Sequence, residues 1–552
     1  MPPEVTAQSS ARGLEFPLPD GGTGNAGETL VSPPTMAKSV IAVSLITMGA
    51  KICGFGEKII IAHFYGTSGR ADVYFAVLGI VWSIVFIVKE LVYPAFLPVY
   101  SRSVPRGDGL SGALFGRVFW VVLTVLMATA LILLPLAPGV IGLCLPGFAG
   151  WRQRLATSLL RGLLPGTVCA GLMVVTYAAL NARKKFTAAA VGDAMLKLGV
   201  VVGLLALTPI WGMYAIGPSL AVAGLLCVVG QLLLLPDKKR LWRPNRSAPS
   251  QKLFRDVRHL ATPLVLGVIV SHASALVDNA LASTLPAGEL SYLAYGKKII
   301  DAVMVVGPVA LVTVVYSKVA GLNAQKRTRD IAELMAKSVR VLLFVSIPLT
   351  GLILGHGASI VRVLFQRGQF DAASTSGTAL ALGVYSCGLV VFALEALLVY
   401  CFYGLSDTRT PVLLGVGFVL VDIGLAVALL PVARYLGIAA ALVISKAGKV
   451  IVLGVLLSRR RNIHFWTART FDVFWKVCVA TGGAWLTTRL LVGAADPGAG
   501  AARAAGNMAV VSVIWCLSFL VLAQGLGIQE GRDVLLAVRL RVGRIFQGRR
   551  RP

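Results

Sequence analysis

The sequence predicts an all-α integral membrane protein with about 14 transmembrane helices. Three observations lead to this prediction: 57% of the 552 residues are hydrophobic, only 14% are charged, and the mean hydropathy is +0.81. A water-soluble domain is nearer half apolar and a quarter charged. Each span needs about 20 apolar residues, so the chain has room for roughly a dozen helices. A soluble enzyme, a disordered protein and a secreted disulfide scaffold are excluded.

The chain opens with a polar segment before the first apolar run. Residues 1–36 are rich in Gly and Pro, so we expect a disordered tail and no signal peptide. Translation could also begin at Met36. Apolar segments then alternate with basic loops. Their predicted bounds are 38–63, 72–100, 115–145, 155–181, 187–209, 212–235, 260–285, 290–317, 334–356, 376–404, 410–432, 435–457, 471–493 and 506–527.

The positive charge of the chain follows this alternation. Loops after even-numbered helices hold 22 Lys and Arg residues, whereas loops after odd-numbered helices hold 7. Cytoplasmic loops of membrane proteins are enriched in these residues. We therefore expect both termini in the cytoplasm. We attribute the net charge of +28 to the topology of a membrane protein and expect no nucleic-acid partner.

Two basic stretches divide the chain into predicted domains. A cytoplasmic linker over 236–259 separates an N-lobe of helices 1–6 (37–235) from a C-lobe of helices 7–12 (260–458). Helices 13 and 14 occupy 459–527. The tail 528–552 mixes Val and Leu with seven Arg, which suits an amphipathic helix on an anionic leaflet. A basic tail that only sets the topology explains it equally well.

The two lobes share a short sequence repeat. Helix 2 ends in Pro-Val-Tyr-Ser at 98–101, and helix 8 ends in Val-Val-Tyr-Ser at 314–317. Such parallel repeats occur in transporters that have two similar halves around a central site.

Ionisable residues within the spans mark a candidate site, because a charge at mid-bilayer costs about 2.5–3.5 kcal/mol and normally faces a cavity or a partner. Lys51 of helix 1 and Lys298 of helix 8 come from equivalent helices, so we interpret them as two cations facing a shared cavity and an anion such as pyrophosphate. The alternative is that Glu57 and Asp301 neutralise them locally. Further charges in the spans are Lys58, Asp72, Lys89, Glu90, Asp193, Lys197, Asp278, Lys297, Glu395, Asp422, Lys446 and Lys449. The spacing of Asp193 and Lys197, and that of Lys297 and Asp301, also permits pairing on one helix face.

No motif for catalysis, metal binding or a cofactor is present. The sequence has no Walker loop, HExxH or GxSxG, and its eight cysteines are scattered without a CxxC. We therefore expect a non-enzymatic protein without cofactor or metal. Any transport would depend on a coupling ion, on the membrane potential or on a downhill gradient.

Three stretches are distinctive in their residues. The first spans 54–98, with Gly-Phe at 54–55, IAHFYG at 61–66, ADVYF at 71–75 and PAFLP at 94–98. The second is LFQRGQF at 364–370, which contains Arg367. The third is Phe-Tyr at 402–403 followed by Asp407, Thr408, Arg409, Thr410 and Pro411. Together they resemble the MurJ/MviN family of lipid II flippases in the MOP exporter superfamily, over roughly residues 38–525.

This resemblance implies a fold and a function. The family fold is a MATE-like V of two six-helix lobes, with two C-terminal helices forming a groove for the lipid tail. The family moves lipid II, an undecaprenyl-pyrophosphate-linked peptidoglycan precursor, across the bacterial inner membrane by alternating access. The implied partners are the lipid-linked saccharide, the membrane and the cell-wall synthesis machinery.

The resemblance also assigns roles to residues. Two family arginines of the cationic cavity fall on Lys51 and Lys298, with Lys58 and Lys297 beside them as further substrate-binding candidates. Glu57, Asp72, Glu90 and Asp301 would tune the cavity and its gating. The residues Arg367 and Asp407 to Pro411 mark the family and would brace helix ends.

The chain departs from the family pattern in its arginines. A second helix-1 arginine falls on Glu57, and a helix-2 arginine pair falls on Val85 and Phe86. Lysine keeps the charge but lacks the bidentate fork of arginine. The alternatives that remain are a flippase for another lipid-linked polysaccharide, a MATE-like exporter of small cations using Asp278, Glu395 and Asp422, and a membrane scaffold without transport.

Overall fold

The computed structural model describes residues 33–106, 108–236, 248–262, 264–306, 308–492 and 501–530. Within these ranges the regular elements are sixteen α-helices and two short 3-10 turns, which confirms the predicted all-α membrane fold. The first helix begins at Pro33, inside the segment that the sequence assigns to the N-terminal tail. The rest of that tail and the predicted C-terminal amphipathic segment after residue 530 lie outside the described residues.

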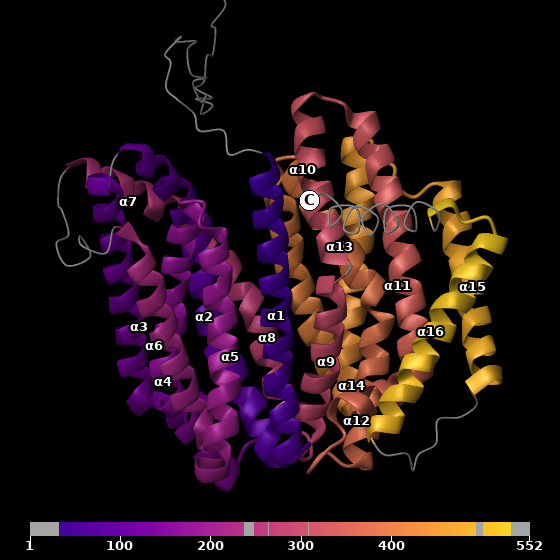
Figure 1. Cartoon of the computed structure of the whole chain (residues 1–552), viewed down its shortest axis with the longest axis horizontal. Helices are drawn as coiled ribbons and strands as arrows, with labels where there is room; N and C mark the ends of the chain where they lie inside the picture. The colour runs from indigo at the N-terminus through magenta and orange to yellow at the C-terminus, as the bar shows by residue number, and fades with distance from the viewer. Residues whose placement is uncertain are drawn as a thin grey trace, which may run out of the picture.

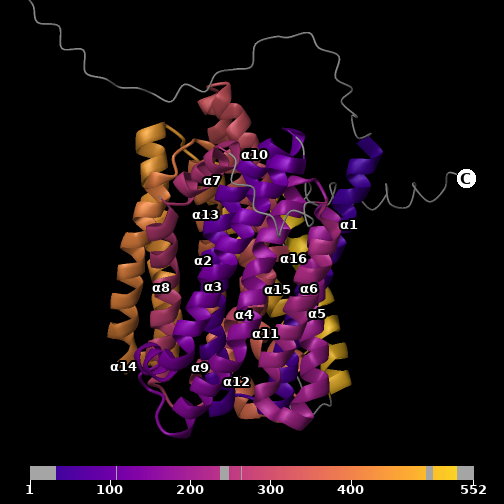
Figure 2. The same cartoon turned by 90° about the vertical axis from the view of Figure 1, so that its left-hand side faces the viewer.

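Six helices form the N-terminal lobe, and α4 lies at its centre against α2, α3 and α6. Figure 2 shows this lobe facing the viewer. Helix α1 packs mainly against α5 and stands beside the other lobe in Figure 1. The bounds are α1 Pro33–Tyr65, α2 Gly69–Ser103, α3 Asp108–Cys144, α4 Trp151–Ala182, α5 Phe186–Trp211 and α6 Ile216–Leu234.

A short amphipathic helix, α7 (Ala248–Ala261), lies within the predicted linker. Its Leu253 and Val257 are buried in a cluster with apolar residues of α2 and α3. The guanidinium of Arg117 lies 4.4 Å from the ring centre of Phe254. The linker is therefore partly a packed element of the N-lobe, which the count of basic residues did not predict.

The C-terminal lobe contains seven helices by their hydrogen bonding. They are α8 Leu264–Ser283, α9 Glu289–Val306, α10 Pro308–Ala324, α11 Thr328–Phe365, α12 Ala372–Cys387, α13 Leu389–Gly404 and α14 Arg409–Arg461. The predicted segment 290–317 contains α9 and α10, and the predicted segment 376–404 bends by 42° at Gly388. Helix α14 holds two predicted segments, which pack side by side because the chain reverses at Arg434 (φ 51°) and Ser445 Oγ donates to the Phe418 carbonyl at 2.7 Å.

Length and composition identify seven described helical stretches that could cross a membrane, or eight if the bent pair α12 and α13 counts as one span. Two of these stretches, 186–234 and 409–461, each contain two of the fourteen apolar segments predicted from the sequence. Many outward-facing side chains are apolar, as a bilayer requires: Ile210, Val432 and Leu490 are more than 70% exposed.

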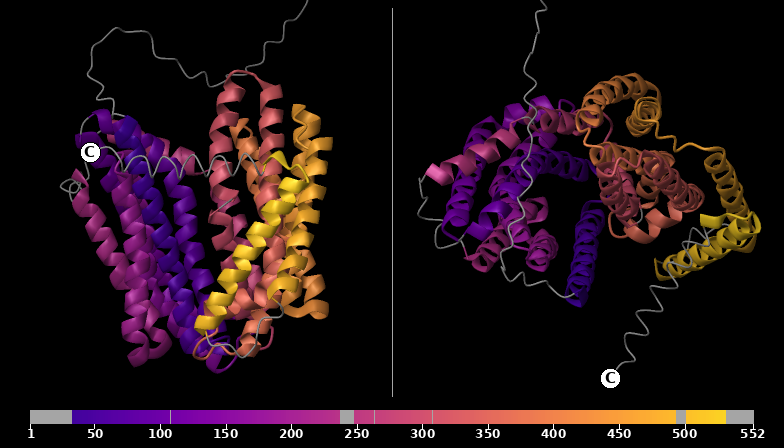
Figure 3. Two further views of the ribbon diagram at one scale, coloured as in Figure 1. Left: turned by 45° about the vertical axis from the view of Figure 1, so that its right-hand side comes forward. Right: turned by 90° about the horizontal axis from the view of Figure 1, so that it is seen from above.

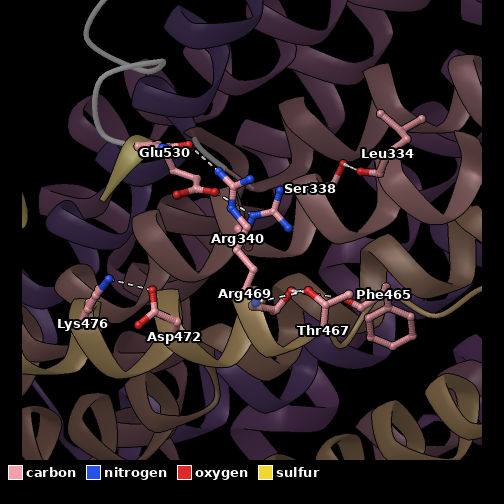
Figure 4. Close-up of polar contacts among 11 residues, drawn as sticks. Leu334, Ser338, Arg340, Phe465, Thr467, Arg469, Asp472, Lys476 and Glu530 are labelled. Atoms are coloured by element: carbon pink, nitrogen blue, oxygen red, sulfur yellow. Dashed lines mark hydrogen bonds and ion pairs between the residues drawn. The ribbon is translucent and has the colours of Figure 1, made fainter. Parts of the chain in front are cut away.

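The last two helices, α15 (Ala468–Val492) and α16 (Ala501–Gly525), pack on each other and on α11. Phe344 of α11 joins Trp515 and Phe519 of α16 in one apolar cluster. Beyond α16, the buried carboxylate of Glu530 accepts a hydrogen bond from Arg340 Nε at 2.6 Å (Figure 4). An ion pair and an apolar seam therefore attach the C-terminal helices to the C-lobe.

The two lobes meet at one end and spread apart toward the other (Figure 1 and Figure 3). We call the meeting point the joined end; it contains the α1–α2 turn, the α8–α9 turn and the loop 366–371. We call the opposite end the basic end, because it contains the predicted cytoplasmic loops after α2, α4 and α6. The apolar cluster at the joined end includes buried residues of both lobes, such as Tyr74, Tyr295 and Phe365.

Candidate functional site between the lobes

Lys51 and Lys298 come from different lobes and lie within electrostatic reach of each other. Lys51 is exposed on α1, and Lys298 is partly buried on α9. Asp301 acts electrostatically on both lysines. Within the described residues, neither lysine forms an ion pair or a side-chain hydrogen bond. Neither Lys51 with Glu57 nor Lys298 with Asp301 forms an ion pair in this structure, although Glu57 and Asp301 both act electrostatically on Lys298.

Glu57 is engaged elsewhere, in a compact group beside α2. Its Oε1 accepts hydrogen bonds from Lys58 Nζ at 2.7 Å and from the hydroxyl of Tyr74. The Lys58 ammonium also lies 5.3 Å and 5.2 Å from the ring centres of Tyr74 and Phe75. Lys58 and Glu57 thus cancel each other's charge. Tyr74 did not stand out in the sequence, although the ADVYF motif contains it.

Lys297 and Asp301 occupy one face of α9, a turn apart, and both are exposed. No ion pair joins them, although their spacing permits one; this differs from the pairing expected in the sequence. The charge of Lys297 acts on Asp278 of α8 and on Asp422 of α14 instead. By contrast, the expected pair Asp193 and Lys197 forms at 2.6 Å.

Asp72 joins the lobes at the joined end. The buried carboxylate at the start of α2 accepts hydrogen bonds from Gly288 N at 2.6 Å, Ser291 N at 2.8 Å and Ser291 Oγ at 2.6 Å. Gly288 immediately precedes α9 and Ser291 lies in its first turn, where unpaired N–H groups and the helix dipole favour an anion. Asp72 of the N-lobe therefore caps a helix of the C-lobe.

Two glycines interlock beside this cap. Gly66 (φ +55°) ends α1, and a Cβ there would lie 2.2 Å from the Gln369 carbonyl oxygen. Gly368 (φ +59°) lies in the opposite loop, and a Cβ there would lie 2.2 Å from the His63 carbonyl oxygen. That His63 carbonyl accepts a hydrogen bond from Gln369 N at 2.9 Å. Only glycine fits either position, which explains why the IAHFYG and LFQRGQF motifs both contain one.

Side-chain contacts complete the joined end. The hydroxyls of Thr67 and Ser374 lie 2.7 Å apart across the lobes, and Tyr295 OH donates to the Gly66 carbonyl at 3.1 Å. Hydrogen bonds from Ser374 hold the pKa of Asp371 below its ordinary value, so this carboxylate is charged at neutral pH and caps α12. The polar contacts at this end thus hold the lobes together.

Glu90 lies farther along α2, toward the basic end. Its Oε2 is 3.5 Å from His272 Nε2 of α8, so it too reaches the other lobe. His272 did not stand out in the sequence, because its role depends on α2 packing against α8.

The remaining motif residues stabilise helix ends. Arg367 Nη2 donates to the Val363 and Leu364 carbonyls at the end of α11, at 2.9 Å and 2.8 Å. Asp407 accepts from Thr410 N at 3.1 Å and from Thr410 Oγ1 at 2.9 Å at the start of α14. Thr408, Arg409 and Pro411 belong to the same turn and first helical residues.

Deeper in the C-lobe, carboxylates have partners of their own. Glu395 Oε1 accepts from Lys446 at 2.9 Å and from Lys449 at 2.8 Å. Asp422 Oδ2 accepts from Ser274 Oγ at 2.8 Å. Glu395 is therefore outnumbered by its cations and presents no net negative charge to a ligand.

The fold and the site define a class: a multi-span transporter with two lobes and ionisable groups between them. Solved structures share the fold. One, described as "Lipid II flippase MurJ, inward closed conformation", has a TM-score of 0.74 at 20% identity and covers 88% of this chain and 99% of its own. Another, an inward-facing MATE family multidrug resistance transporter of the MOP superfamily, has a TM-score of 0.66 at 13% identity and covers 78% and 99%.

The sequence comparisons give the family. The model of the lipid II flippase MurJ family matches residues 61–493, so the chain belongs to that family, which comprises transporters and not enzymes. A probable lipid II flippase MurJ of Rhizobium meliloti (strain 1021) is 26% identical over 74% of this chain and 78% of its own length. One of Rhizobium tropici is also 26% identical, over 78% and 82%. The protein is accordingly a multi-pass membrane protein.

Proposed function

We propose that this protein moves lipid II from the cytoplasmic to the outer leaflet of the bacterial inner membrane, with Lys51 and Lys298 binding its diphosphate. The observation that carries the proposal is that these two cations come from opposite lobes, form no ion pair within the described residues, and are both under the electrostatic influence of Asp301. Cations without a carboxylate partner are suited to an anionic ligand, because an opposite charge nearby favours their charged form. Family membership supplies the substrate.

The shape of the molecule supports alternating access. With the basic end in the cytoplasm, the lobes are apart on the side where lipid II is made and joined on the other side. Asp72 and the interlocked glycines Gly66 and Gly368 would then be the outer gate. Release of substrate outside requires these contacts to break while the lobes approach each other at the basic end. An ion gradient or the membrane potential would drive this cycle.

The mutations Lys51→Ala and Lys298→Ala test the proposal. Each variant should reach the membrane but fail to support growth of a strain depleted of its own lipid II flippase, while Lys51→Arg and Lys298→Arg should retain function because the charge remains. Lys476→Ala is the matched control, since Lys476 of α15 already pairs with Asp472 at 2.7 Å. Full growth with both alanine variants would remove the two lysines from the mechanism.

A transport-inactive scaffold predicts a different result: neither the wild type nor any variant would support growth. A MATE-like exporter of small cations finds less support, because Lys446 and Lys449 neutralise Glu395, one of its three candidate acidic residues.

A further inference from the structure

An aromatic surface runs along α2 at the seam with α8. Trp82 and Phe86, one helical turn apart, have ring centres 5.9 Å apart. Phe86 and His272 of α8 have ring centres 6.0 Å apart and planes inclined by only 8°. Phe86 is 41% exposed, although its neighbour Val85 is buried. Phe86 thus packs on the His272 ring of the other lobe and is inclined by 31° to Trp82, so the three rings form one aromatic group built from both lobes.

Charged groups lie beside the aromatic rings. Lys89 Nζ lies 6.0 Å from the Phe86 ring centre, and the Lys89 charge acts on Lys51 of α1. Glu90, one turn beyond Phe86, acts electrostatically on Tyr403 of α13 in the opposite lobe. Phe86 therefore lies beside a charged side chain of its own helix and against a ring of the opposite lobe.

Tyrosines of the C-lobe form a second aromatic group. The ring centres of Tyr316 and Tyr400 lie 5.7 Å apart, and those of Tyr400 and Tyr403 lie 5.8 Å apart. Tyr316 and Tyr400 are 40% and 43% exposed. Tyr100, which occupies the position of Tyr316 in the sequence repeat, is fully buried. The exposure of Tyr316 is thus a property of this lobe and is not dictated by the repeat.

Polar groups beside the rings have unused hydrogen-bonding capacity. The Glu90 side chain is 49% exposed. His272 Nε2 lies 3.5 Å from it and is buried without a hydrogen-bond partner within the described residues, so Glu90 is the group that a ligand can reach. Aromatic faces with a few polar groups at their edge are suited to a pyranose, whose C–H face packs on a ring while its hydroxyls bond at the rim.

The spacing along the helices agrees with the order of groups in a lipid-linked sugar. Lys51 and Lys298 lie about 14–21 Å along their helices from the joined end, whereas Phe86 and Glu90 lie about 25–32 Å along α2 from it. Phe86 and Glu90 therefore lie farther toward the basic end than the lysines, whereas Trp82, about 20 Å along α2, lies level with them.

We propose that Phe86, His272 and Glu90, together with Tyr400 and Tyr403, form a saccharide subsite that binds the sugar next to the diphosphate. The proposal rests on the proposed function, since it takes the lysines as the diphosphate site.

Two lipids test this subsite by binding to the purified full chain in nanodiscs: undecaprenyl diphosphate, and the same lipid bearing the disaccharide without its peptide. The wild type should bind the disaccharide lipid about tenfold more tightly than undecaprenyl diphosphate. Phe86→Leu and Glu90→Gln should each remove most of this advantage and leave the affinity for undecaprenyl diphosphate unchanged. Phe471→Leu is the matched control, because Phe471 is 60% exposed on α15.

The outcomes separate the two proposals. If the advantage persists in Phe86→Leu and Glu90→Gln, or if the wild type has none, the subsite is wrong and the diphosphate site stands. If the wild type binds neither lipid, both proposals fail. Folding is checked by size exclusion, on which the variants should elute with the wild type. If they also bind undecaprenyl diphosphate as the wild type does, a weaker preference for the disaccharide lipid is not a folding defect.

Discussion

At the scale of single residues, the site contains two kinds of cation: those that already pair with a carboxylate, and those that are available to a ligand. Lys58 and Glu57 form one ion pair, and Lys446 and Lys449 share Glu395. Lys51 and Lys298 have no such partner within the described residues. The type of residue is the same in each case, so the difference arises from which neighbours the fold provides.

The contact between Tyr74 and Glu57 gives a prediction at this scale. Tyr74→Phe removes a hydrogen bond to a carboxylate in a largely buried group, so it should lower the free energy of unfolding by about 1–3 kcal/mol. Tyr177→Phe should change it little, because the Tyr177 hydroxyl has no hydrogen-bond partner among the described residues. Denaturant titration of both variants in bicelles measures this difference; equal losses would show that the contact contributes nothing.

At the scale of elements, the joined end depends on helix termini that fit between the lobes. Asp72 caps α9 from the other lobe, and the turn after α1 requires glycine. A short polar cap can be made and broken more readily than a large apolar interface, because water can replace its hydrogen bonds.

Gly66→Ala should therefore weaken closure of the joined end. The added Cβ would overlap the Gln369 carbonyl, so the loop 366–371 must move away. Cross-linking between cysteines introduced at Thr67 and Ser374, whose hydroxyls lie 2.7 Å apart, should fall several-fold. Gly49→Ala in the same helix should leave it unchanged, since no atom lies within 4 Å of the added Cβ. Undiminished cross-linking in Gly66→Ala would contradict the interlock.

The elements also show what could be predicted from the sequence. All fourteen apolar segments form helices, because apolar length is a local property of the chain. Three features depend on contacts between distant segments. They are the bend at Gly388, the packing of α7, and the electrostatic action of Lys297 on Asp278 and Asp422. The aromatic contact of Phe86 with His272 could not be predicted either, because the two residues lie on different helices.

At the scale of the whole molecule, alternating access requires the joined end to open during each cycle. The same cysteine pair at Thr67 and Ser374, once oxidised, should lock this end and stop growth complementation. Reduction should restore it, and either single cysteine should support growth. Transport by the oxidised double variant would show that the lobes do not separate there.

The central claim is that Lys51 and Lys298 together bind a diphosphate between the lobes. Titration of undecaprenyl diphosphate into the wild type, Lys51→Ala, Lys298→Ala and the double variant in nanodiscs tests it most directly. Each single variant should weaken binding by about tenfold to a hundredfold, and the double variant should bind little more weakly than either one, because both lysines hold the same group. Wild-type affinity in both single variants would contradict the claim.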